Sequence, residues 1–226
     1  MFNGKFDNDE KRYFKIRNSL LVTDRIEVIS KFIKPKTIHE EIFEIGSGTG
    51  NLILELAIKY PNKNFVGMDP LKNYVKHCIQ ESKNRKIYNV AFINDRVENL
   101  DKYNQLNQKI STILTVDTLH HIEDLNIALT RISPISKRKT LWVIIEPNVH
   151  NLYIRLYHYL KSGEKNFHQE EFIKKASKNN WTLVTKKYFY LIPIKFRKFR
   201  ILEIIEKKFK VPRFMAGSVL IVLERN

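Results

Sequence analysis

The chain of 226 residues has one cysteine, Cys78, only seven glycines, and too few acidic residues to balance its cations. A single cysteine excludes an internal disulfide framework and a cysteine-based zinc site, so no metal is expected. No uninterrupted apolar run approaches the roughly 20 residues that span a bilayer. The polar, charged stretch 1–12 does not resemble a signal peptide. We therefore expect a cytoplasmic protein.

The excess positive charge is concentrated toward the C-terminus. The whole chain has a formal net charge of +16, and residues 151–226 hold 17 basic and six acidic residues, a net +11. A basic field attracts nucleic acid, phosphorylated metabolites or an anionic membrane surface. A lysine-rich, solvated surface explains the same excess without any partner, and composition alone does not decide between these interpretations.

Strand and helix patterns alternate from Thr37 onward. Apolar runs indicate strands at 42–45, 64–69, 90–93, 111–116, 140–146, 181–190 and 218–224. Helical periodicity marks 51–60, 71–83, 122–131, 168–179 and 201–209, and the first 37 residues are mainly helical up to Pro35. Apolar strands alternating with helices predict an α/β fold. Its sheet is mostly parallel, covered on both faces, with an antiparallel last strand near the edge.

Three of the seven glycines follow directly after the first expected strand. Gly46, Gly48 and Gly50 permit a tight turn and a close approach of the backbone to a ligand. The helix after them offers free N–H donors at its N-terminus. A dinucleotide-binding loop spaces its glycines as G-x-G-x-x-G, whereas here the third glycine comes one residue early. Glu44 precedes the first glycine by two residues, and a carboxylate there suits a ligand with a cationic group.

The segment Glu44-Ile45-Gly46-Ser47-Gly48-Thr49-Gly50 resembles the first motif of the class I S-adenosylmethionine (SAM)-dependent methyltransferases. The resemblance continues in order, at the ends of the later strands, through 66–70, 94–100, 117–122 and 145–148. It covers roughly residues 38–148. Several motifs in the right order, each ending an expected strand, are more specific than one glycine loop. The resemblance implies a Rossmann-like, seven-stranded sheet.

It also implies S-adenosyl-L-methionine as the cofactor, with S-adenosyl-L-homocysteine as the product. In the family pattern, Asp69 would accept hydrogen bonds from the ribose hydroxyls and Asp95 would meet the adenine amino group. The segment that contains Asp117 and Thr118 would lie beside the methyl group. The residues expected to bind the cofactor are Glu44, Gly46, Ser47, Gly48, Gly50, Asp69, Pro70, Asp95, Arg96, Asp117 and Thr118.

Methyl transfer is an in-line displacement, so the protein mainly positions the acceptor. A hydroxyl acceptor must also lose a proton, and His120 and His121 are the candidate catalytic bases. Packing against the core or capping of the next helix explains the two histidines equally well. Further candidates for lining the acceptor pocket are Glu146, Tyr153, His158 and His168.

We expect residues 1–226 to form one domain. It consists of a helical cap at 1–37, a cofactor-binding core at 38–148, and an acceptor-covering insertion with the C-terminal strands at 149–226. The aromatic stretch 148–167 suits a small or amphiphilic acceptor, although core packing also explains it. The leading prediction is O-methylation of a small-molecule, saccharide or lipid-linked acceptor. The alternatives are an RNA-directed enzyme that uses the basic C-terminal third and a non-catalytic SAM-binding partner subunit.

A cluster in that basic third alternates cations with aromatic residues. It consists of Lys195, Phe196, Arg197, Lys198, Phe199 and Arg200, followed by Lys207, Lys208 and Lys210. The three-residue spacing of the aromatics favours packing beneath a solvated basic face. Contact with an anionic membrane surface, which would place the protein peripherally at the inner membrane, ranks second. Stacking on RNA bases ranks third.

Overall fold

A computed structural model of the chain describes residues 20–33, 40–160, 166–190 and 211–226. Its strands are β1 (Glu41–Ile45), β2 (Asn64–Met68), β3 (Val90–Ile93), β4 (Ile110–Val116), β5 (Ser136–Pro147), β6 (Trp181–Phe189) and β7 (Ser218–Arg225). Its α-helices are α2 (Leu20–Ser30), α3 (Asn51–Lys59), α4 (Lys72–Asn84), α5 (Leu125–Ile135), α6 (Leu152–Leu160) and α7 (Gln169–Lys178). Short 3-10 helices are η2 (Val97–Lys102), η3 (Asn104–Leu106) and η4 (Leu119–His121). These elements alternate along the chain as the sequence predicts.

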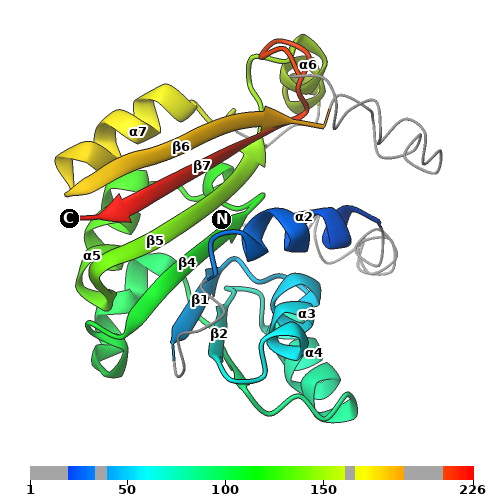
Figure 1. Cartoon of the computed structure of the whole chain (residues 1–226), viewed down its shortest axis with the longest axis vertical. Coiled ribbons are helices and arrows are strands. Elements are labelled where there is room, and N and C mark those ends of the chain that lie inside the picture. Colours follow the sequence, from blue (N-terminus) through cyan, green and yellow to red (C-terminus); the bar gives the residue numbers. More distant parts are fainter. Residues whose placement is uncertain (1–19, 34–39, 161–165, 191–210) are drawn as a thin grey trace.

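The seven strands form one twisted sheet in the order β3-β2-β1-β4-β5-β7-β6 (Figure 1). Strands β1 to β5 pair in parallel. The last strand, β7, lies between β5 and β6 and is antiparallel to both. The predicted fold class, a mostly parallel seven-stranded sheet with an antiparallel last strand, is therefore confirmed.

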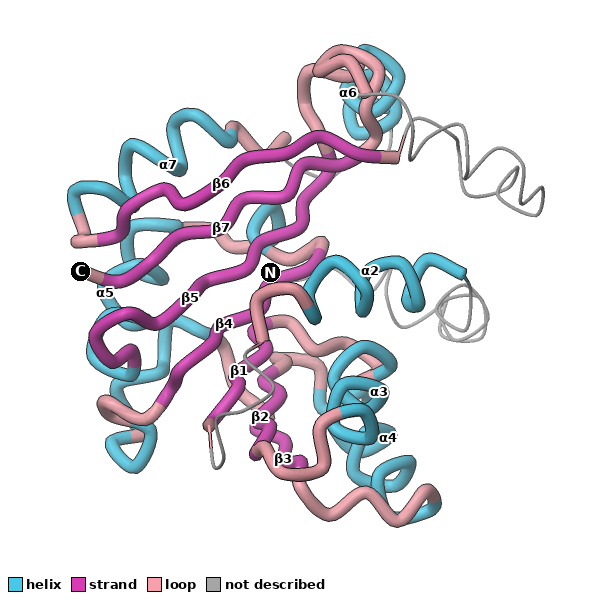
Figure 2. The backbone as a smooth tube through the Cα atoms, in the orientation of Figure 1, coloured by secondary structure: helices cyan, strands magenta, loops and turns pink. Residues whose placement is uncertain are grey.

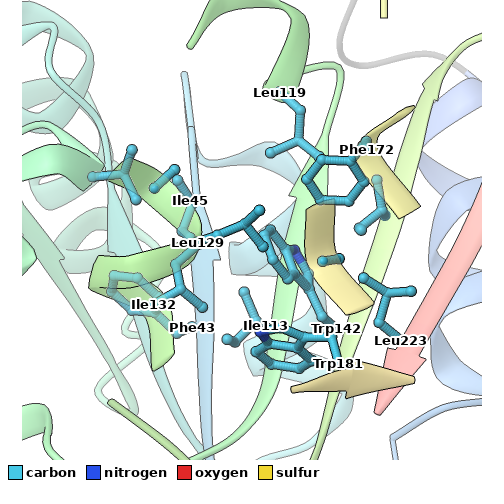
Figure 3. Packing of buried hydrophobic residues seen from close by; sticks show 14 of the residues in the cluster. Phe43, Ile45, Ile113, Leu119, Leu129, Ile132, Trp142, Phe172, Trp181 and Leu223 are labelled. Atoms are coloured by element: carbon cyan, nitrogen blue, oxygen red, sulfur yellow. The ribbon is translucent and has the colours of Figure 1, made fainter. Parts of the chain in front are cut away.

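Helices cover both faces of the sheet because its central strands are apolar on both sides. Every residue of β4 is buried. One face packs against α2 and α3, and the other packs against α5 and α7 (Figure 2). On the second face, the ring of Trp142 lies 5.3 Å from Trp181 and 5.5 Å from Phe172, measured between ring centroids (Figure 3). These aromatic contacts attach the C-terminal elements to the central sheet.

Among the element boundaries that differ from the sequence prediction, two have a clear cause. The helix expected to start at Ile122 starts at Leu125, because the Asp124 carboxylate accepts the N–H groups of Asn126 and Ile127 and caps it there. The strand expected at 140–146 already begins at Ser136, where it pairs with Ile110. The helix predicted at 201–209 and most of the N-terminal cap lie outside the described residues.

The strand order determines where a ligand can bind. The chain moves from β1 outward to β2 and β3, then crosses back to β4 and continues in the other direction. In open α/β sheets, the crevice at such a switch point, beyond the carboxyl ends of the strands, is the usual binding site.

Within the described part of the chain, no helix is long and apolar enough to cross a membrane.

Candidate functional site

A cavity lies at the switch point, beyond the carboxyl ends of β1, β2, β3 and β4. It is lined by Ile45, Gly46, Gly48, Met68, Asp69, Pro70, Leu71, Tyr74, Asp95, Arg96, Val97, Glu98, Asp117, Thr118, His121, Ile122 and Glu123. Its volume is about 820 Å³, counting the space open to solvent. We call this space the cofactor cavity.

The glycine loop forms one wall of the cofactor cavity. The N–H groups of Gly46 and Ser47 both donate to the carbonyl of Met68, at 2.8 and 3.0 Å, which ties the loop to the end of β2. Gly46 has a φ of 74°, and a Cβ there would lie 2.3 Å from Oγ1 of Thr118. Only glycine therefore lets the loop approach the segment after β4 this closely.

Asp69, after β2, joins the glycine loop to the next helix. Its Oδ2 accepts the N–H of Gly48 at 2.8 Å, and its Oδ1 accepts the N–H of Leu71 at 2.9 Å. The side chain is buried, and these bonds compensate for removing the carboxylate from water. An ionised carboxylate has about four acceptor positions, and this one lines the cofactor cavity.

Asp95, after β3, is held by its own loop. Its Oδ1 accepts the N–H of Arg96 at 2.8 Å and Nδ2 of Asn99 at 2.6 Å, and its Oδ2 accepts the Tyr103 hydroxyl at 3.0 Å. Burial alone would raise the pKa of Asp95, but these bonds and nearby Lys102 outweigh it and lower the pKa. The carboxylate therefore stays negative where it lines the cavity.

Asp117, after β4, forms an ion pair with Arg25 of α2. The Arg25 side chain is 11% exposed and the Asp117 side chain 31%. Burial would lower the pKa of Arg25, but the negative charge of Asp117, helped by Tyr190 and Glu146, raises it overall. The pair fixes α2 beside the cofactor cavity. Arg25 cannot be recognised from the sequence, because no motif marks a contact between residues 92 positions apart.

The two candidate catalytic histidines occupy different positions. His121 lines the cofactor cavity. His120 is buried, and its Nδ1 lies 2.7 Å from Oε2 of Glu146, at the end of β5. The two histidine rings are in contact, with centroids 3.9 Å apart. The structure thus brings both histidines to the cavity region, and only His120 is held by this carboxylate.

A second cavity adjoins the first. Its lining is Leu119, His120, Ile122, Glu123, Asp124, Leu125, Asn126, Asn166, Phe167, His168, Glu171, Phe172 and Lys175. It shares Ile122 and Glu123 with the cofactor cavity. We call it the side cavity. It includes His168, which the sequence analysis named as an acceptor-pocket candidate.

Other predicted residues do not line either cavity. Glu44 and Ser47 are buried beside the cofactor cavity but are not among its lining residues, and Gly50 caps α3. Tyr153 is 70% exposed on α6. The side chain of His158 falls outside the described residues, as does the basic cluster at 195–210.

Cys78 supports the glycine loop from behind. Its thiol donates to the carbonyl of Gly48 at 3.3 Å, and its Sγ would lie 2.8 Å from a Cβ at Gly50. The cysteine is fully buried, so it packs beneath the loop rather than facing a reactant.

Comparison with known proteins settles the family. The family model described as a methyltransferase domain matches residues 36–210. The chain belongs to the methyltransferase domain family. This match confirms the prediction of a class I SAM-dependent methyltransferase domain and of S-adenosyl-L-methionine as its cofactor.

Individual relatives match shorter stretches. A bifunctional glycosyltransferase/methyltransferase of Fusobacterium nucleatum is 43% identical over 60 residues, covering 26% of this chain and 9% of that protein. A ribosomal RNA small subunit methyltransferase G of Vibrio cholerae is 32% identical over 96 residues, covering 40% of this chain and 46% of that protein. The matches thus span less than half the length of either relative.

Solved structures share the fold of this chain over nearly its whole length. The crystal structure of a SAM-dependent methyltransferase from Archaeoglobus fulgidus superimposes with a TM-score of 0.66 at 16% identity. The alignment covers 90% of this chain and 94% of that one. At this identity the likeness shows the shared fold alone.

Proposed function

We propose that the chain transfers the methyl group of SAM to an oxygen atom of a small-molecule, saccharide or lipid-linked acceptor. When bound, the cofactor supplies an electrophilic methyl group on a sulfonium, which is already an excellent leaving group. The residues of the chain bind the cofactor, orient the acceptor behind the methyl group and exclude water.

The residues that line the cofactor cavity support the proposal that SAM binds there. Gly46 and Gly48 line this cavity with positive φ angles, so the backbone there can approach a ligand closely. The carboxylates of Asp69, Asp95 and Asp117 lie around the same cavity. SAM carries a sulfonium, an ammonium, ribose hydroxyls and an adenine amino group, all of which carboxylates attract or accept hydrogen bonds from. In this proposal, the eleven residues named from the sequence form or support the cofactor site.

An exposed apolar patch is the observation that supports the proposed class of acceptor. We use this term for five exposed apolar side chains on two neighbouring segments: Leu152, Tyr153, Leu156, Phe214 and Met215. The first three belong to α6 and the last two to the neighbouring loop, which Asn151 joins to α6 through a 2.9 Å hydrogen bond to the carbonyl of Met215 (Figure 2). Apolar side chains gathered on a surface commonly mark contact with a ligand, a membrane or a partner.

Cations beside this apolar patch favour an anionic, amphiphilic partner. Arg155 and Arg213 are exposed in the same two segments, and the chain as a whole is strongly basic. Apolar side chains together with cations are typical of proteins that bind at the surface of anionic membranes. A lipid-linked acceptor would be presented at such a surface. The name of the Fusobacterium nucleatum relative, which joins a glycosyltransferase to a methyltransferase, favours a saccharide portion.

An RNA acceptor is the second candidate. It is favoured by the similarity to a ribosomal RNA methyltransferase over 40% of the chain. The net +11 of residues 151–226 also suits phosphate contacts. A non-catalytic SAM-binding subunit is the third candidate, and it would bind the cofactor without turning it over.

The full chain, incubated with methyl-labelled SAM, distinguishes these candidates. It should be offered, in separate reactions, a polar metabolite extract, a lipid extract in vesicles and bulk RNA. Label entering a lipid or metabolite supports the proposal. Label entering RNA alone contradicts it, and cofactor binding with no transfer to any fraction supports the partner-subunit alternative.

Vesicle binding tests the apolar patch itself. We expect the chain to sediment with phosphatidylglycerol vesicles, and the double variant Leu152→Glu/Phe214→Glu to lose this binding. Tyr88→Glu is the matched control, because Tyr88 is 85% exposed outside the patch and should bind as the unchanged chain does. Equal vesicle binding by all three proteins would contradict a role for the patch.

A further inference from the structure

Glu146, at the end of β5, is a fully buried carboxylate with three hydrogen-bond partners in one segment. Its Oε1 accepts the N–H of Thr118 at 2.8 Å and the N–H of Leu119 at 2.7 Å. Its Oε2 lies 2.7 Å from Nδ1 of His120. A buried charge is costly unless it is compensated in this way, so Glu146 and the segment 118–120 form one unit.

This unit is coupled to the cofactor cavity through Thr118. Thr118 lines the cavity and packs so closely on Gly46 that a Cβ there would lie 2.3 Å from its Oγ1. By holding the N–H groups of Thr118 and Leu119, Glu146 fixes the position of this wall against the glycine loop.

Glu146 also determines which ring nitrogen of His120 donates a hydrogen bond and which one accepts. An ionised carboxylate can only accept hydrogen bonds, as Oε1 of Glu146 does from the two N–H groups. Nδ1 of His120 must then carry the proton, so that Nε2 of the neutral ring is an acceptor. His120 also lines the side cavity, which adjoins the cofactor cavity at Ile122 and Glu123.

We propose that Glu146 is a positioning residue that holds His120 in the Nδ1–H tautomer, and that Nε2 of His120 takes the proton from an alcohol acceptor bound in the side cavity. This inference rests on the proposed function and selects His120 rather than His121 as the base. The acceptor oxygen forms a bond to the methyl carbon while the carbon–sulfur bond breaks, leaving its electron pair on sulfur. The hydroxyl proton moves to Nε2, and the carboxylate of Glu146 stabilises the resulting imidazolium.

The substitution Glu146→Gln distinguishes a role of Glu146 in positioning His120 from a role in folding of the turn. The amide oxygen can still accept the N–H groups of Thr118 and Leu119, whereas the opposite orientation would place an NH₂ group against two N–H donors. The amide NH₂ therefore faces Nδ1 of His120 and donates to it. We expect the ring proton of His120 to move to Nε2. That nitrogen can then no longer take a proton from the alcohol, while the N–H groups of Thr118 and Leu119 keep their hydrogen bonds.

Nitrogen-15 NMR of the histidine rings in the full chain, at a pH where they are neutral, reads the tautomer directly. We expect His120 to carry its proton on Nδ1 in the unchanged chain and on Nε2 in Glu146→Gln. Binding of S-adenosylhomocysteine should be unchanged. Transfer of labelled methyl groups to the active extract should fall by about 10²- to 10⁴-fold. His120→Gln should lose as much, and the double variant should lose no more.

Glu55→Gln is the matched control, since Glu55 pairs with Arg85 on the surface of α3 and should change none of these measurements. A proton on Nε2 of His120 in the unchanged chain would overturn the inference. Full turnover by Glu146→Gln or His120→Gln would also overturn it. Failure of the unchanged chain to bind S-adenosylhomocysteine would instead reject the proposed function, because the tautomer measurement requires no cofactor.

Discussion

Asp95 shows how a single side chain at the cavity is controlled by its neighbours. Three donors from its own loop, including the Tyr103 hydroxyl, hold the carboxylate in its ionised form and lower its pKa. A carboxyl group with a lowered pKa stabilises the folded state at pH values above its unfolded pKa of about 3.9. That stabilisation is lost as the pH falls through the lower, folded-state pKa.

We therefore predict that Tyr103→Phe raises the pKa of Asp95 toward its usual value, because one hydrogen bond to the carboxylate is lost. Since less of the pKa shift remains, acid unfolding should begin at a higher pH. Carboxyl NMR titration and acid unfolding followed by circular dichroism measure the two effects. Tyr88→Phe, at an 85% exposed position, is the control. An unchanged pKa of Asp95 in Tyr103→Phe would contradict this account.

At the scale of single residues, the sequence predicts some positions better than others. Asp69 and Asp117 follow apolar strands directly and Asp95 follows one after a single residue, so strand prediction alone places all three at one edge of the sheet. The contact between Glu146 and His120 joins positions 26 residues apart and depends on the packing of β5 beside β4. No local pattern marks that contact, and the sequence therefore offers Glu146 only as one of several pocket candidates.

At the scale of elements, the docking of α2 depends on a charge pair that local sequence does not reveal. The helix places Ile29 in the core, and Arg25 pairs with Asp117 at the cavity. Removing one partner of a buried pair leaves the other charge uncompensated. The partial exposure of Asp117 weakens this effect through solvent screening.

We predict that Arg25→Gln lowers the free energy of unfolding by about 1–3 kcal/mol, below the range for fully buried pairs because water reaches Asp117. Urea unfolding measures the change. Arg131→Gln is the matched control, because its pair with Asp101 is exposed and should contribute only about 0–1 kcal/mol. Equal losses in the two variants would show that the Arg25–Asp117 pair has no special role in docking α2.

Element boundaries were harder to predict than element types. The start of β5 contains Lys137, Arg138 and Lys139, which look like a polar loop in the sequence. Pairing of Ser136 with Ile110 on β4 extends the strand across them. Pro134 likewise suggests an early helix end, yet it lies within the last turn of α5. Tertiary pairing overrides local preference at both positions.

At the scale of the whole molecule, the sheet and its ligand-binding edge follow from the sequence because apolar strands and helices alternate in one consistent order. The nature of the acceptor does not follow in the same way. In our proposal it depends on surfaces such as the apolar patch, formed by α6 and a loop about 60 residues later in the chain. The proteins that the chain resembles also differ in name, one being a bifunctional glycosyltransferase/methyltransferase and another a ribosomal RNA methyltransferase.

Calorimetric titration of SAM into the full chain tests the central claim, that the cavity at the carboxyl edge binds this cofactor. We predict one site per chain in the unchanged protein. Asp69→Ala should weaken binding by about 1–3 kcal/mol, because it removes a charged acceptor and the anchor of Gly48. Asp101→Ala, at an exposed position outside the cavity, should bind as the unchanged chain does. No binding by the unchanged chain, or equal affinity in Asp69→Ala, would contradict the account.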